Sequence, residues 1–223
     1  MTATSHACAL LSGALALAYL LRYCTAPVSL VRSAVKTGAI LVLALGALLA
    51  PDEPWLLVVA LTLCAVGDWL LSRRGQGAFL AGVGAFALGH VAYVALFLTH
   101  RMSDIDRALG SGMILIVPLV LFGLGMAALM WRHAGDLRGP VLAYIAIIVL
   151  MGASVLTLPG LYPVHYAHPA AAMFILSDTV LAFEIFVLRE GSRLRRVTPY
   201  VVWTTYWLAQ FGLFLAFAGI PTK

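Results

Sequence analysis

The chain has 223 residues, of which 63% are apolar and only 10% are charged, and its mean hydropathy is +1.01. A soluble domain of this length could not bury so much apolar surface in one core, so the composition excludes a soluble enzyme and a disordered chain. The formal net charge of +5 comes from basic residues in short loops, where such residues orient membrane proteins, so no nucleic-acid partner is expected. The composition predicts a polytopic, all-α integral membrane protein whose surroundings are the lipid bilayer.

Eight apolar runs are long enough to cross a bilayer as helices, which requires about 20 residues each. In chain order they are residues 7–24, 34–50, 55–72, 77–99, 109–131, 139–158, 168–188 and 200–219. The first run is expected to be a retained helix rather than a signal peptide, because no Lys or Arg precedes it. The loops are too short to form a second domain. The sequence therefore predicts a single eight-helix transmembrane domain over residues 1–223.

The basic residues are divided unequally between the two ends of the predicted bundle. Three lie at one end, namely Arg101, Arg107 and Lys223, and eleven lie at the other end, in residues 22–36, 73–74, 132–138 and 189–199. In membrane proteins the cytoplasmic loops carry the excess of Lys and Arg. We therefore expect the four basic loops in the cytoplasm and both termini on the non-cytoplasmic side of the cell (inner) membrane.

Polar side chains inside the predicted spans are costly in a bilayer, so each of them needs a reason. Two aspartates stand out, because Asp68 lies near the cytoplasmic end of the third span and Asp178 lies close to the middle of the seventh. The other polar residues of interest in the spans are Lys36, His90, Tyr93, Tyr144, Ser177, Tyr206 and Gln210. Facing lipid would leave these groups unsatisfied. We expect the bundle to turn them inward, around one polar pocket towards the cytoplasmic half.

Purely structural interpretations exist for some of these positions. A single buried histidine often serves only to join packed helices, and Lys36 at the membrane boundary could extend to water and set the topology. Two glycine pairs, Gly82 with Gly84 and Gly123 with Gly125, lie within predicted spans. In a lipid-embedded helix such glycines indicate close helix contacts rather than a phosphate-binding loop.

Several of these residues occur in a pattern that resembles the YhhN-like lysoplasmalogenase family. The pattern consists of Gly67–Asp68 followed by Phe79, Gly82, Phe86, His90 and Tyr93, and of Ala171–Phe174 followed by Ser177–Asp178 and Leu181–Ala182. Weaker matches are Lys36, Tyr144 with Met151, and Tyr206 with Gln210. Thr37 stands where the family usually has a proline after the lysine. The resemblance covers residues 32–215.

This resemblance implies an eight-helix membrane hydrolase. Its substrate would be a lysoplasmalogen, an alkenyl-glycerophosphocholine or -ethanolamine, and its products a fatty aldehyde and the glycerophospho-head group. It also implies that Asp68 and Asp178 are the acid–base pair. Vinyl ether hydrolysis fits two carboxyls, because one must deliver a proton to the β-carbon and the other must face the resulting oxocarbenium ion. We expect Asp178 to be the general acid, although the reverse assignment remains open.

The remaining polar residues are predicted to bind the lysophospholipid substrate. We expect His90, Tyr93 and Gln210 to hold water and glycerol oxygens, Lys36 to bind the phosphate as a point charge, and the site to include Tyr144, Ser177 and Tyr206. This chemistry needs no metal or other cofactor, and the three cysteines do not have metal-site spacing.

Two alternatives remain open from the sequence. Intramembrane Asp, His and Tyr also form proton relays, so a small-solute or proton-coupled transporter is one alternative. The other is a non-catalytic lipid-binding membrane protein. Neither the head-group preference nor the oligomeric state follows from the residues.

Overall fold

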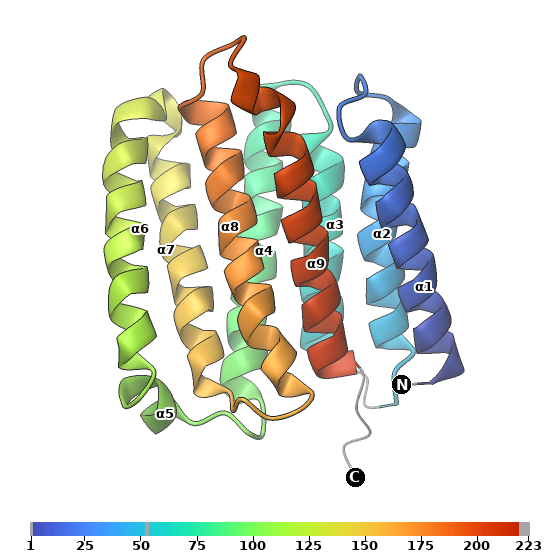
Figure 1. Ribbon diagram of the computed structural model, residues 1–223, viewed down its shortest axis with the longest axis vertical. Coiled ribbons are helices and arrows are strands. Elements are labelled where there is room, and N and C mark those ends of the chain that lie inside the picture. The colour runs from blue at the N-terminus through green and yellow to red at the C-terminus, as the bar shows by residue number, and fades with distance from the viewer. Residues whose placement is uncertain (1, 52–53, 219–223) are drawn as a thin grey trace.

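The structure is a computed structural model that describes residues 2–51 and 54–218. Helices are its regular elements, and within the described residues there is no strand. The α-helices are α1 (Ala3–Ala18), α2 (Leu30–Leu48), α3 (Trp55–Leu71), α4 (Gln76–Thr99), α5 (Ile105–Leu109), α6 (Met113–His133), α7 (Arg138–Ser154), α8 (Ala167–Phe186) and α9 (Thr198–Ala218). All except the short α5 run roughly parallel to one another in a bundle (Figure 1). The predicted all-α architecture is confirmed for this part of the chain.

Seven stretches of the described residues are helical, long and apolar enough to cross a membrane. They contain α1, α2, α4, α6, α7, α8 and α9. The remaining long helix, α3, is apolar but has 17 residues. A multi-pass membrane protein therefore follows from the structure, whereas an eighth crossing by α3 stays a prediction.

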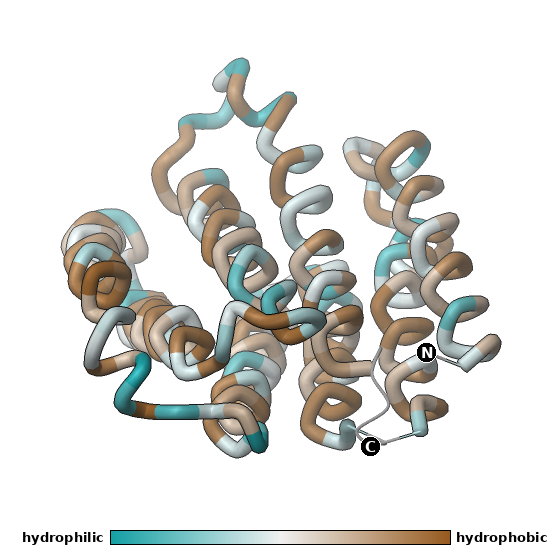
Figure 2. The backbone as a smooth tube through the Cα atoms, turned by 60° about the horizontal axis from the view of Figure 1, so that its bottom comes forward, coloured by the Kyte–Doolittle hydropathy of each residue, from teal (hydrophilic) through white to brown (hydrophobic). Residues whose placement is uncertain are grey.

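The connections alternate between the two ends of the bundle. The loops α1–α2, α3–α4, α6–α7 and α8–α9 lie at one end, while α1 begins and α9 ends at the opposite end (Figure 1). The four loops with eleven basic residues thus share one end, which we call the basic end. Figure 2 shows hydrophilic residues gathered mainly in the loops and hydrophobic residues along the helices. Lys223, assigned to the opposite end, lies outside the described residues, and the side of the membrane that each end faces stays a prediction.

The helix boundaries differ from the predicted spans for local reasons. The second helix begins at Leu30 rather than residue 34, because the Ser29 hydroxyl accepts a hydrogen bond from the Arg32 backbone N–H at 3.1 Å and caps the helix. Residues 100–108 lie between two predicted spans, but most of the short helix α5 (Ile105–Leu109) falls in this connection. The Asp104 carboxylate caps α5 at the Asp106 N–H, with an oxygen–nitrogen distance of 3.0 Å. A helix of five residues leaves no hydropathy period to detect.

Close glycine contacts hold α3 against α4. A Cβ at Gly67 would lie 2.5 Å from the Phe86 ring, and one at Gly82 would lie 2.8 Å from the Leu71 side chain. Gly123 similarly meets Val149 on α7, whereas Gly84 and Gly125 have nothing within 4 Å. The predicted helix contact is therefore correct for one glycine of each pair. The tight α3–α4 contact fixes Asp68 and His90 relative to each other.

The long helices of the bundle do not all pack closely on one another. The helix α8 packs chiefly on α9, whereas α7 packs on α4 and α6 and makes fewer contacts with α8. On the other side, α2 packs on α1, α3 and α9. The candidate site lies in a space between α2, α3, α4, α6, α7, α8 and α9.

Candidate active site

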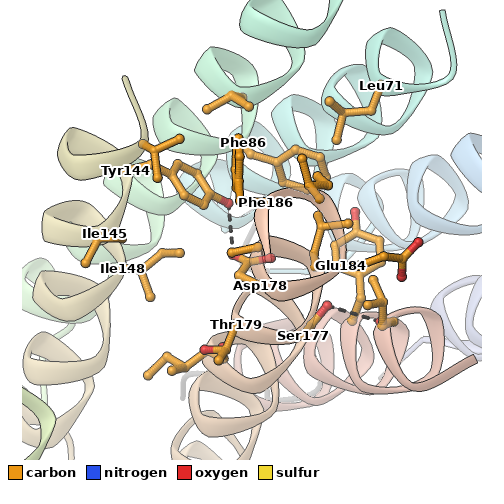
Figure 3. A pocket seen from close by; sticks show the side chains of 18 of the residues that line it. Leu71, Phe86, Tyr144, Ile145, Ile148, Ser177, Asp178, Thr179, Glu184 and Phe186 are labelled. Carbon is orange, nitrogen blue, oxygen red and sulfur yellow. Dashed lines mark hydrogen bonds between the residues drawn. The ribbon is translucent and has the colours of Figure 1, made fainter. Parts of the chain in front are cut away.

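One cavity of about 280 Å³ opens between the helices towards the basic end. Side chains from every long helix except α1 line it, together with Tyr19 and Cys24 after α1. Both predicted aspartates line it, as do Lys36, Tyr144, Ser177 and Tyr206. Figure 3 shows Tyr144 and Asp178 facing each other from α7 and α8. The residues predicted to surround a single pocket are thus largely brought together.

Asp68 lies at the centre of a charged cluster formed by three helices. Its side chain is 0% exposed, and its Oδ1 lies 2.7 Å from the Nζ of Lys36 on α2. The Tyr206 hydroxyl on α9 donates a hydrogen bond to Asp68 Oδ2 at 2.8 Å. The Lys36 ammonium also lies 5.9 Å from the ring centroids of Trp203 and Tyr206, within the range of a cation–π interaction. The Lys36 ammonium is therefore paired with Asp68 inside the bundle rather than extended to the membrane boundary.

Asp178 has different partners. The Tyr144 hydroxyl donates a hydrogen bond to Asp178 Oδ2 at 2.9 Å (Figure 3). His90 Nε2 lies 3.6 Å from the same oxygen. The ion pairs of the described residues give Asp178 no lysine or arginine partner. Its negative charge therefore lacks the compensation that Asp68 receives.

The His90 ring orientation determines which nitrogen faces Asp178. Its Nδ1 lies 2.7 Å from the Phe86 carbonyl oxygen, and only a protonated nitrogen can hydrogen-bond a carbonyl. In the neutral ring, Nε2 then carries a lone pair. Its neighbour Asp178 Oδ2 is also an acceptor when ionised, and the two side chains are 0% and 11% exposed. The 3.6 Å contact is nevertheless longer than a hydrogen bond, and Nε2 has no hydrogen-bond partner among the described residues.

Three predicted substrate-binding residues lie outside the cavity lining. They are His90, Tyr93 and Gln210, and each is 0% exposed. Tyr93 donates a hydrogen bond to Gln210 Oε1, which joins α4 to α9 behind the cavity wall. Ser177 does line the cavity, but its hydroxyl donates to the Val202 carbonyl at 3.1 Å. Tyr93 and Ser177 thus join α4 and α8, respectively, to α9.

Arg32, Glu184 and Trp203 are among the lining residues that the sequence did not assign to the site. Arg32 and Glu184 lie near the predicted membrane boundary, where charges are common and attract no attention. The spacing of Arg32 and Lys36 was available as a signal, because residues four apart share a helix face. The lining also has an apolar part, formed by Leu119, Phe122 and Met126 of α6, Ile145, Ile148 and Val149 of α7, and Ile175 of α8. We call this part the apolar limb.

Comparison with known proteins now identifies the family. Residues 31–217 match the YhhN family. The chain belongs to this family. Lysoplasmalogenases of Mycobacterium tuberculosis and Mycobacterium bovis are each 29% identical over 167 residues, which is 72% of this chain and 62% of theirs. Human lysoplasmalogenase TMEM86A is 30% identical over 188 residues, which is 80% of this chain and 71% of the human protein.

The chain covers only part of the length of its relatives. The matched region spans 62% of the length of the mycobacterial relatives. No solved structure matches the chain. The membership predicted from the sequence motifs is nevertheless confirmed, since the family match includes both aspartates and every other predicted site residue.

Proposed function

We propose that this chain is a multi-pass membrane lysoplasmalogenase. In this proposal, residues 1–223 form one domain of eight spans in the cell (inner) membrane, with the basic end in the cytoplasm and the termini on the other side. The enzyme hydrolyses the vinyl ether bond of an alkenyl-glycerophosphocholine or -ethanolamine. Support comes from the family and from the printed names of its relatives. The observation that carries the chemistry is a pair of buried carboxyls on one cavity with different partners.

The shape of the cavity supports a lipid with one hydrocarbon chain. The apolar limb between α6, α7 and α8 suits the chain, while the charged and hydroxyl groups gather nearer the basic end. An alkenyl chain in the limb brings its first carbons to Asp178 and Tyr144. A membrane enzyme also obtains this substrate directly from the bilayer.

In the first chemical step, the His90–Asp178 pair supplies the proton. Asp178 protonates the β-carbon of the vinyl ether, and the carbon bonded to oxygen becomes an oxocarbenium ion. An ionised Asp178 without a cation would be unfavourable among apolar side chains, which supports Asp178 as the acid. Tyr144 holds Oδ2 and so orients the carboxyl. His90 acts on Asp178 as a positioning residue rather than on the substrate.

In the second step, Asp68 faces the developing positive charge and orients the attacking water. Water adds to the oxocarbenium carbon and gives one proton to the Asp178 carboxylate, which restores the acid. The hemiacetal then collapses to a fatty aldehyde and the glycerol hydroxyl of the head-group product. Lys36 and Tyr206 hold Asp68 in place in this proposal. Because Lys36 is paired with Asp68, its role in this proposal is to hold Asp68, and not to bind the substrate phosphate as the sequence suggested. Tyr93, Gln210 and Ser177 fix α4, α8 and α9 around the carboxyls.

The direct test is aldehyde release by the purified protein in detergent. We expect release from lysoplasmenyl-choline or -ethanolamine and none from the saturated alkyl-ether analogue, which lacks the double bond. Asp68→Asn and Asp178→Asn should each abolish most of the activity. Asp136→Asn, at an exposed position at the basic end, is the matched control. Full activity in both buried-site variants contradicts the mechanism, and no aldehyde from the unmodified protein contradicts the proposed substrate.

A further inference from the structure

Two side chains of opposite charge line the cavity where it reaches the basic end. Arg32 lies two residues after the first residue of α2, and Glu184 lies two residues before the last residue of α8. Neither belongs to the Asp68 or the Asp178 cluster. Figure 3 shows Glu184 beside the cavity, on the same helix as Asp178. A ligand whose reactive bond lies at the aspartates would therefore extend its polar end towards these two groups.

Backbone carbonyls hold the guanidinium of Arg32 in place without using all of its N–H donors. Its Nε donates to the Tyr23 carbonyl at 2.9 Å and its Nη2 donates to the Cys24 carbonyl at 3.3 Å. The group also lies 5.5 Å from the centroid of the Tyr19 ring. Nη1 makes no hydrogen bond with any described residue. A positioned guanidinium with free N–H groups is a preferred partner for phosphate oxygens.

The carboxylate of Glu184 is not neutralised by a neighbour. No ion pair among the described residues includes it. The nearby Arg195 instead donates to the backbone carbonyls of Glu184 and Leu188, at 2.7 and 2.9 Å. The arginine that could have paired with Glu184 is thus occupied at the end of α8. An intermediate degree of burial and a place on the cavity wall leave this carboxylate available to a cation.

Cys24 also lines the cavity, and its carbonyl accepts the hydrogen bond from Arg32 Nη2. Cys24 follows the last residue of the first membrane span, Tyr23. Arg32 near the start of α2 and Glu184 near the end of α8 line the cavity at this same end.

We propose that Arg32 and Glu184 form a head-group site for a zwitterionic phospho-amine, in which Arg32 binds the phosphate and Glu184 binds the ammonium. The identity of the lipid rests on the proposed function, but the site itself does not require turnover. Lys36 cannot take the phosphate role without leaving Asp68, from which its Nζ is 2.7 Å away. Opposite charges on one cavity favour a zwitterion over a plain phosphate ester, because both of its charges are then compensated.

The test is equilibrium binding of saturated alkyl-ether lysolipids, which cannot be hydrolysed as vinyl ethers. Three probes differ only in the polar end: phosphoethanolamine, phosphate alone, and a free hydroxyl. Binding is followed by tryptophan fluorescence, since Trp203 lines the cavity. The variants are Arg32→Gln, Arg32→Lys and Glu184→Gln. Arg196→Gln and Glu190→Gln change exposed residues at the same end, outside the lining, and are the matched controls.

Arg32→Gln should weaken binding of both phosphate-bearing probes about tenfold, as expected for loss of one partly exposed charge-assisted hydrogen bond. It should leave the hydroxyl probe unchanged, and Arg32→Lys should recover part of the loss. Glu184→Gln should weaken only the phosphoethanolamine probe. Equal weakening of all three probes by either variant would mean a structural role and would overturn the proposal, as would no weakening at all.

Two further measurements distinguish the head-group site from a free-phosphate site and from the proposed enzymatic function. Inorganic phosphate is titrated alone, and tight binding that depends on Arg32 but is unaffected by an attached chain would indicate a free-phosphate site and overturn the head-group proposal. If the unmodified protein releases no aldehyde but shows the expected binding pattern, the proposed function fails while the head-group site stands. If the protein releases aldehyde but lacks the expected binding pattern, the proposed function stands and the head-group site is overturned.

Discussion

Replacing Lys36 by methionine tests whether the buried ion pair with Asp68 stabilises the bundle. The Asp68 side chain is 0% exposed and Lys36 only 22%, and their charged atoms are 2.7 Å apart. Lys36→Met keeps much of the side-chain volume but leaves a buried carboxylate with only the Tyr206 hydroxyl. Breaking a buried pair in this way costs about 3 kcal/mol of unfolding free energy, or roughly 6–12 °C in melting temperature for a chain of this size.

The assay is thermal unfolding in detergent, with aldehyde release measured in parallel. The double variant Lys36→Met with Asp68→Asn removes both charges and should regain most of the lost stability while remaining inactive. That pattern separates an uncompensated charge from lost packing, because packing loss would persist in the double variant. A melting temperature for Lys36→Met equal to that of the unmodified protein, or a double variant no more stable than the single one, would refute this account of the cluster.

Three other changes test the rest of the site. Asp178→Asn should lower kcat by about 10²- to 10⁴-fold, the usual contribution of a general acid, with little change in binding of a saturated lysolipid; a large binding loss with normal turnover would contradict its role. Gly67→Ala should lower the free energy of unfolding by about 1–3 kcal/mol, because the added Cβ would lie 2.5 Å from the Phe86 ring. The control Gly84→Ala places its Cβ in open space and should be neutral. Equal melting temperatures for the two variants would argue against the close contact. Ile148→Trp should fill the apolar limb and raise KM more for long-chain than for short-chain substrates, and an equal change for all chain lengths would place the chain elsewhere.

Much of the fold follows from hydropathy alone. Each predicted span overlaps one long helix, because about 20 apolar residues between polar loops leave few other solutions in a bilayer. The alternation of basic loops also places them at one end of the bundle. The short α5 was invisible, since a helix of five residues has too few positions to show a period.

The sequence indicates which polar residues lie within the helices, but not which of them contact one another. Asp68 and Asp178 stand out because buried carboxyls are costly. The contact between Asp68 and Tyr206 joins residues 138 positions apart, and nothing local to either indicates it. Helical periodicity gives the face on which Lys36 lies, yet only the packing of α2 on α3 determines that it meets Asp68. The unpaired state of Glu184 likewise depends on Arg195 binding backbone carbonyls.

The hydrogen bond from Tyr144 to Asp178 joins two helices that otherwise pack mainly on different neighbours. Any movement that separates α8 from α7 must break this bond, and the same movement widens the apolar limb. If Asp178 is the general acid, as proposed, Tyr144 orients it only while α7 and α8 are together. In the proposed mechanism, a separation of α7 and α8 that admitted the hydrocarbon chain would therefore also leave the Asp178 carboxyl without its Tyr144 partner.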